Sequence, residues 1–119
     1  MEVLELVKQT VKVLSEKKAV DIRVIRIDKL SVVADYFIIC NGTSSTQIKA
    51  LADEVEYRLS ERGATPLHRE GYRFGNWVLL DYGSVVIHIF HKETRDFYKL
   101  ERLWADGEEL DPSSFLGSE

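Results

Sequence analysis

The sequence has one cysteine, no long apolar run and no excess of basic residues, and each absence excludes a class of protein. The lone Cys40 can form neither an intramolecular disulfide nor, without other ligands at suitable spacing, a structural zinc site. The longest apolar stretches, such as Val85–Ile87, are far shorter than the ~20 residues that a membrane span needs. The segment Met1–Glu5 lacks the basic region and the apolar run of a signal peptide. We therefore expect a cytoplasmic protein with no membrane partner.

Acidic residues outnumber basic ones. The chain has 16 Lys and Arg against 20 Asp and Glu, which gives a formal net charge of −4 at pH 7. A protein that binds nucleic acid by neutralising phosphates needs a clear excess of basic side chains on one face. Little or no direct nucleic-acid binding is therefore expected. A basic protein partner suits this charge better.

The chain has the length of one domain. A compact fold of 119 residues buries roughly 65% of the surface that its unfolded chain exposes, so one apolar core can stabilise it. No Pro-, Ser- or Gly-rich linker and no internal repeat divides the sequence. We predict a single domain over residues 1–106. Acidic residues gather after it, and we expect residues 107–119 to form a flexible acidic tail.

Apolar residues at helical spacing predict three helices. Ser44 and Gln47 have the spacing of a capping box, which places a helix start there, and Gly63 is suited to the end of that helix. The other two helices are expected over Glu2–Lys18 and Lys92–Asp106.

Alternating or continuous apolar runs predict five strands. The strands are expected at Asp21–Asp28, Tyr36–Cys40, Pro66–Glu70, Trp77–Tyr82 and Val85–Phe90. Pro66 indicates an edge strand, because proline cannot donate to a ladder, and Gly83–Ser84 joins the last two strands into an antiparallel hairpin. The order αββαβββα predicts an α+β domain in which helices flank a mixed sheet of about five strands.

The turn Cys40–Ser45 is a candidate phosphate-binding turn, because the amides at a helix N-terminus attract anions. It lacks the Gly-Lys-Ser/Thr ending of a Walker motif. In nucleotidyltransferases such a turn is followed by a strand with two alternating metal-binding carboxylates. Here Asp81 alternates with Leu79 and Gly83, so the second carboxylate is missing. We assign the Ser and Thr cluster to helix capping and keep nucleotide transfer as the less favoured alternative.

The histidines His68, His88 and His91 do not suggest a metal site. His88 and His91 are three residues apart, so they point to opposite faces of a continuous strand. His88 lies between two isoleucines, which favours a hydrogen-bonded histidine inside a buried strand. Cys40 is interpreted as a small buried apolar residue. We expect no catalytic residue, no metal and no cofactor.

The aromatic residues indicate more about function than the histidines and Cys40 do. Along Trp77–Tyr82 the side chains alternate, so Trp77 and Asp81 share one face of the strand and Tyr82 lies on the other. Both faces are largely apolar, and covering both would leave a surplus of aromatic surface. Trp, Tyr and Arg are the residues that dominate binding hot spots. Each aromatic alone can equally be a core residue, but together they indicate a surface that docks onto a protein.

Six blocks, in order, resemble the ribosomal silencing factor family, RsfS or Iojap. They are Gly42–Ser45, Ala52–Asp53, Glu70–Gly71, Trp77–Gly83, Val86–Phe90 and Arg95–Trp104. The resemblance extends from about Leu4 to Asp106, and the combination of blocks is specific although each block alone is weak.

The resemblance implies an α+β domain related in fold to nucleotidyltransferases but without their catalytic carboxylates. It implies a factor that binds ribosomal protein fourteen of the large subunit, blocks joining of the two ribosomal subunits and represses translation when nutrients are short. It implies no enzymatic activity and no cofactor, and a homodimer when the protein is free of the ribosome.

The matching blocks also imply the docking residues, with His88 as a structural residue inside. They are Trp77, Asp81, Tyr82, Arg95, Tyr98, Glu101 and Trp104. A nucleotidyltransferase-like enzyme and a plain homodimeric scaffold remain as second and third hypotheses.

Overall fold

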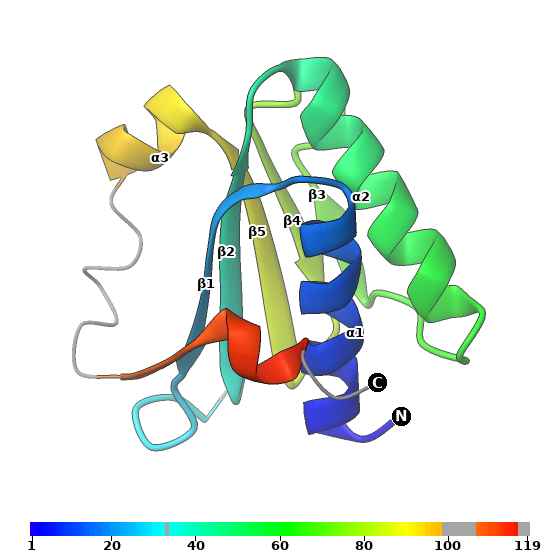
Figure 1. The fold of residues 1–119 in the computed structure, drawn as a ribbon, viewed down its shortest axis with the longest axis vertical. Helices are drawn as coiled ribbons and strands as arrows, with labels where there is room; N and C mark the ends of the chain where they lie inside the picture. The colour runs from blue at the N-terminus through cyan, green and yellow to red at the C-terminus, as the bar shows by residue number, and fades with distance from the viewer. Residues whose placement is uncertain (33, 99–106, 117–119) are drawn as a thin grey trace.

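The computed structural model describes residues 1–32, 34–98 and 107–116. Its elements, in chain order, are α1 (Val3–Glu16), β1 (Val20–Arg26), β2 (Tyr36–Gly42), α2 (Ser45–Ser60), β3 (His68–Glu70), β4 (Trp77–Asp81), β5 (Val85–His91), α3 (Lys92–Tyr98), β6 (Glu108–Leu110) and the 3-10 helix η1 (Pro112–Phe115) (Figure 1). The first eight elements follow the predicted order. The predicted helix beyond Tyr98 lies outside the described residues.

The strands form one mixed sheet in the order β3-β4-β5-β2-β1-β6. Strands β2 and β5 are parallel, and the other neighbours are antiparallel, including the predicted β4–β5 hairpin. Strand β3 is at an edge, as Pro66 indicated. The α+β class and the mixed sheet are confirmed, with six strands in place of about five. A relation to the nucleotidyltransferase fold stays a prediction.

The sixth strand comes from the segment that was expected to be a flexible tail. Strand β6 pairs with β1, and Leu110 packs against the core opposite Val24. Glu108 and Glu109 form ion pairs with Arg26 and Arg23 of β1, at 3.8 and 3.5 Å. Two acidic side chains of this segment thus pair with arginines far away in the sequence, while staying exposed at the surface. The division of the chain at residue 106 remains a prediction.

Helix α2 begins where the capping signal placed it. The Ser44 hydroxyl accepts a hydrogen bond from the Gln47 amide at 3.1 Å. The Gln47 side-chain oxygen accepts from both the amide and the hydroxyl of Thr43, one residue earlier than in the usual capping box. The polar groups at this helix start therefore bond to one another.

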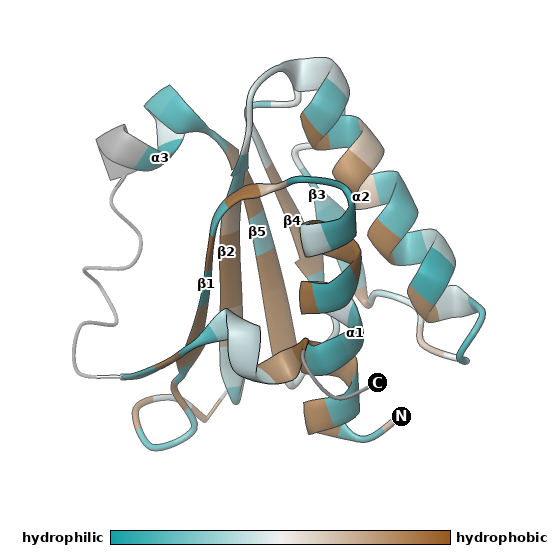
Figure 2. Ribbon diagram, viewed as in Figure 1, coloured by the Kyte–Doolittle hydropathy of each residue, from teal (hydrophilic) through white to brown (hydrophobic). Residues whose placement is uncertain are grey.

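Helices α1 and α2 lie side by side on one face of the sheet, which we call the helix-covered face (Figure 1). Figure 2 shows that the central strands β2 and β5 are hydrophobic over most of their length. The strand residues buried on this face include Val24, Ile38, Cys40, Val78, Leu80, Ile87 and Ile89. Each fully buried aliphatic side chain of this size contributes about 1.5–3 kcal/mol to folding. This layer is the main core, and it fixes the position of the opposite face of the sheet.

Candidate docking face of the sheet

The opposite face of the sheet carries a cluster of rings, which we call the aromatic face. It is defined by Phe37 of β2, Trp77 of β4, and Val86, His88 and Phe90 of β5. Alternation along each strand turns these side chains away from α1 and α2. Phe90 is fully buried, whereas Phe37, Trp77 and Val86 are half-buried. Aromatic side chains are enriched at protein interfaces, so this face is a candidate docking surface.

Trp77 is the largest side chain of this face, and it contacts Phe90 and His88. Its ring stacks on Phe90, its partner across the β4–β5 ladder, with ring centres 4.8 Å apart and an interplanar angle of 27°. Its indole Nε1–H donates a hydrogen bond to Nδ1 of His88 at 3.0 Å. The stacking contact and the hydrogen bond both hold the indole in place.

His88 is the buried, hydrogen-bonded histidine that its position between two isoleucines predicted. It is 4% exposed, and its ring lies 4.9 Å from Phe37 and 6.1 Å from Phe90, centre to centre. Burial penalises the charged imidazolium and lowers the pKa of His88 to about 4. The imidazole is therefore neutral at pH 7.

Asp81 lies on the same side of β4 as Trp77, at the other end of the strand. Its Oδ1 accepts a hydrogen bond from the Gly83 amide at 2.7 Å. This bond closes the turn between β4 and β5, so Asp81 has a structural role. The carboxylate is half-buried and adds negative charge beside the aromatic face.

Tyr82 does not join this surface. It packs against the core on the helix-covered face, and its hydroxyl is buried with no hydrogen-bond partner among the described residues. Burial raises the pKa of Tyr82 above its ordinary value. The alternation that brings Trp77 and Asp81 together is the physical reason that Tyr82 lies on the other side.

Arg95, at the end of the sheet, is buried and only 4% exposed. Its Nη1 donates to the carbonyl of Asp21 at 2.8 Å and to Oδ1 of Asn41 at 3.0 Å, and Nη2 lies 3.4 Å from the Asp21 carboxylate. Asp21 has a positive φ of 52° and sits in an irregular stretch of β1. Arg95 thus ties α3 to β1 and β2. This burial does not fit the direct partner contact predicted for it.

The remaining predicted docking residues lie at or beyond the end of α3. Tyr98 is the last residue of that helix, and Glu101 and Trp104 lie outside the described residues. Of the seven predicted residues, the structure brings only Trp77 and Asp81 to one described surface. The other assignments stay predictions.

The sequence analysis missed the contributions of Phe37 and Val86. The signal was present in the run Tyr36–Cys40, which is apolar without alternation. Such a run is typical of a strand with both faces covered by apolar groups. Reading it that way would have placed Phe37 on the face opposite Ile38.

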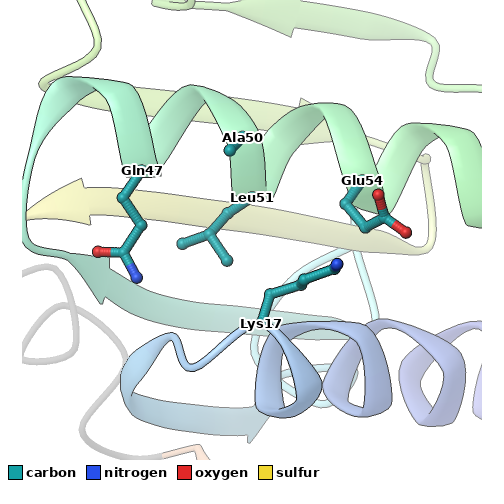
Figure 3. Close-up of a pocket in the computed structure, with 5 residues that line it drawn as sticks. All are labelled: Lys17, Gln47, Ala50, Leu51 and Glu54. Atoms are coloured by element: carbon teal, nitrogen blue, oxygen red, sulfur yellow. The ribbon is translucent and has the colours of Figure 1, made fainter.

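The described part of the chain also has small surface depressions away from the aromatic face. A depression of about 170 Å³ between the end of α1 and α2 is lined by Lys17, Gln47, Ala50, Leu51 and Glu54 (Figure 3). Another, of about 230 Å³, lies beside the candidate phosphate-binding turn. There the Thr43 amide already donates to the Gln47 side chain and the Gln47 amide to the Ser44 hydroxyl, which supports the capping interpretation.

Two further findings bear on chemistry. Burial raises the pKa of Cys40 to about 12, so its thiol is a poor nucleophile near neutrality. Within residues 1–32, 34–98 and 107–116, no cluster of three His, Cys, Asp or Glu side chains can hold a metal ion. In the same part of the chain, every helix is too short or too polar to span a bilayer.

The fold and this face define a small α+β domain with a mixed sheet, one face of which is covered by helices and the other of which carries half-buried aromatic residues. The family described as "Ribosomal silencing factor during starvation" matches residues 1–118, and the chain belongs to that family.

Known relatives agree with this assignment. The chain is 44% identical to the ribosomal silencing factor RsfS of Bacillus subtilis over 91 residues, which are 76% of this chain and 77% of that protein. It is 40% identical to the RsfS of Halalkalibacterium halodurans, over 86% of this chain and 87% of that one. A crystal structure of a Chromobacterium violaceum protein superposes with a TM-score of 0.86 at 36% identity, covering 93% of this chain and 92% of that one.

Proposed function

We propose that this protein is a cytoplasmic translation repressor that binds the large ribosomal subunit through its aromatic face. Its partner there is ribosomal protein fourteen. Occupying that protein blocks joining of the small subunit by steric exclusion, and translation falls when nutrients are limiting. The mechanism requires no catalysis and no cofactor, and the free protein is a homodimer.

The observation that carries the proposal is the half-buried Trp77, stacked on a buried Phe90 at the edge of an apolar ring cluster. Tryptophan is the residue most enriched in binding hot spots, and it contributes most where it is surrounded by groups that exclude water. Phe37 and Val86 supply such surroundings on the same face.

Charge supports the choice of partner. The chain has a formal net charge of −4, and Asp81 adds a carboxylate at the margin of the aromatic face. Ribosomal proteins that contact RNA carry excess positive charge, so an acidic partner gains attraction during encounter. Binding of this kind weakens as salt rises, because the Debye length falls from about 10 Å at 0.1 M to about 3 Å at 1 M.

The experiment is sedimentation with separated ribosomal subunits, followed by a subunit-joining assay. We expect the protein to co-sediment with large subunits, not with small subunits, and to reduce the yield of joined ribosomes. Absence of binding to large subunits would contradict the function. Binding without inhibition of joining would contradict the steric mechanism.

A nucleotidyltransferase-like enzyme is the alternative, favoured only by the depression beside the Cys40–Ser45 turn. A nucleotide bound there with magnesium would raise the melting temperature by linkage. No shift at millimolar nucleotide and magnesium is the expected result.

A further inference from the structure

Carboxylates neutralise nearly all the arginines of this acidic chain. Among the described residues, every arginine but one forms an ion pair, and the paired ones are Arg23, Arg26, Arg58, Arg62, Arg69 and Arg95. The exception is Arg73, which is exposed in the loop between β3 and β4. That loop, Gly71–Asn76, contains no acidic residue. The guanidinium of Arg73 is therefore available to an anion from outside the protein.

The next residue, Phe74, is the most exposed aromatic side chain that the structure describes. It is 74% exposed, compared with 60% for Tyr57. The guanidinium carbon of Arg73 lies 6.0 Å from the centre of the Phe74 ring, at the outer limit of a cation–π contact. A flat apolar ring and a cation thus lie side by side at the tip of the loop, where neither contributes to the core.

Contacts within the loop and with α2 hold this tip in a fixed position. The Tyr72 hydroxyl donates to the Asp53 carboxylate of α2 at 2.8 Å, and the guanidinium of Arg69 lies 3.7 Å from the centre of the Tyr72 ring. The Gly75 amide donates to the Gly71 carbonyl at 3.2 Å, which closes the loop. A binding loop that is already ordered loses little conformational entropy when it docks.

An exposed ring beside a cation suits nucleic acid. Unstacked bases stack on aromatic side chains, and Arg binds phosphate. Lys49 of α2 adds a second positive charge beside the loop, with its Nζ 5.7 Å from the centre of the Tyr72 ring. A basic ribosomal protein, in contrast, would be repelled by Arg73. The net charge of −4 argues against an extensive nucleic-acid interface, but it leaves room for one local contact, since salt screens distant charges.

We propose that Arg73 and Phe74 contact ribosomal RNA of the large subunit, with Phe74 stacked on an unpaired base and Arg73 bound to a phosphate. The choice of the large subunit rests on the proposed function. The loop leads directly into β4, so the RNA contact lies next to the aromatic face. Docking is divided between the two surfaces: the aromatic face meets protein, and the loop tip meets RNA.

A matched pair of arginine substitutions tests the phosphate contact through binding to purified large subunits at several salt concentrations. Arg73→Gln should weaken binding about threefold to tenfold, and it should reduce the slope of log K against log salt by about 0.7, the value for one phosphate of a single strand. Arg62→Gln removes the same charge just beyond the other end of α2, where Arg62 pairs with Glu5, and should change neither quantity. Equal effects of the two variants, or no effect of Arg73→Gln, would overturn the proposal.

Stacking is tested by a matched pair of aromatic substitutions. Phe74→Ala should weaken binding about tenfold, with an unchanged melting temperature because the ring is exposed. Tyr57→Ala, which removes the other strongly exposed ring, should bind as wild type does. Unchanged affinity of Phe74→Ala would contradict the stacking contact.

The chemistry of the partner at the loop tip is identified by crosslinking. With Phe74 replaced by its photoreactive benzoyl derivative, irradiation of the complex should join the loop to ribosomal RNA. A crosslink to ribosomal protein alone, or none in a complex that forms, would overturn the RNA contact.

Failure of this contact is distinguishable from failure of the proposed function. If wild type does not bind large subunits, the proposed function fails and the RNA contact fails with it. If wild type binds and Trp77→Ala weakens binding, while Arg73→Gln and Phe74→Ala bind as wild type does, only the RNA contact fails.

Discussion

The two faces of the sheet differ in what they bury. The helix-covered face buries mostly aliphatic side chains, packed by α1 and α2, together with Cys40 and the hydroxyl of Tyr82. The aromatic face buries Phe90 and isoleucines, together with the polar side chains of His88 and Asn41. A buried polar group costs stability unless it is bonded, and on the aromatic face His88 bonds to Trp77 and Asn41 bonds to Arg95. In the proposed function, the first face holds the fold and the second meets the partner.

The largest expected effect comes from two adjacent leucines of β4 that point to opposite faces. Leu80 is fully buried on the helix-covered face, and Leu79 is half-buried on the side of Trp77. Leu80→Ala should lower the free energy of unfolding by about 3–4 kcal/mol, since it leaves a cavity in a packed core. Leu79→Ala should cost about 1–2 kcal/mol, because much less apolar area is lost. Urea unfolding measures both, and equal costs would contradict the division of roles.

The next effect is a loss of stability in acid that arises on the aromatic face. The pKa of His88 is lowered to about 4 by burial, from the model-compound value of 6.5. In the unfolded chain His88 takes up a proton more readily than in the folded one. Its contribution to the free energy of unfolding is therefore complete above pH 6.5 and is lost as pH falls toward 4. By linkage this amounts to roughly 3 kcal/mol.

Urea unfolding from pH 7.5 to pH 4 measures this loss. The His88→Leu variant is the control, since it keeps the titration of the carboxylates and lacks that of the histidine. Its stability should fall less than that of wild type over this range. Parallel curves for the two proteins would show that His88 is not buried and neutral.

A smaller difference in stability is expected between alanine substitutions at two glycines with positive φ. Gly71 has a φ of +80°, and a Cβ added there would lie 1.9 Å from the Trp77 carbonyl oxygen. Gly63 has a φ of +88° but open space around it. Gly63→Ala should cost about 1 kcal/mol from backbone strain alone. Gly71→Ala should cost about 2 kcal/mol, because β4 must also shift at Trp77. Thermal unfolding compares them, and equal costs would show that the approach to Trp77 relaxes freely.

Much of the fold could be predicted because its signals are local. Ser44 and Gln47 fixed the start of α2, and alternation fixed the faces of β4. Strand β6 could not be predicted, because its acidic residues form ion pairs with Arg23 and Arg26, which lie more than eighty positions away. Long-range pairing of that kind leaves no periodic pattern in either segment.

The candidate site was predictable only in part. Trp77 and Asp81 share a face by alternation, and the same rule already separated Tyr82 from them. The burial of Arg95 had no such signal, because two of its contacts are a backbone carbonyl and a side chain on other strands. Nor did spacing indicate that Trp77 donates to His88, since the bond joins two strands diagonally across the hairpin.

The central claim is that the aromatic face docks onto the large ribosomal subunit, and a matched pair of aromatic substitutions tests it most directly. Trp77→Ala removes the half-buried indole, whereas Tyr57→Ala removes a ring on α2 that is 60% exposed. Co-sedimentation with large subunits should show that Trp77→Ala weakens binding at least tenfold, or about 1.4 kcal/mol, while Tyr57→Ala binds as wild type does. A folded Trp77→Ala variant with unchanged affinity would contradict the account.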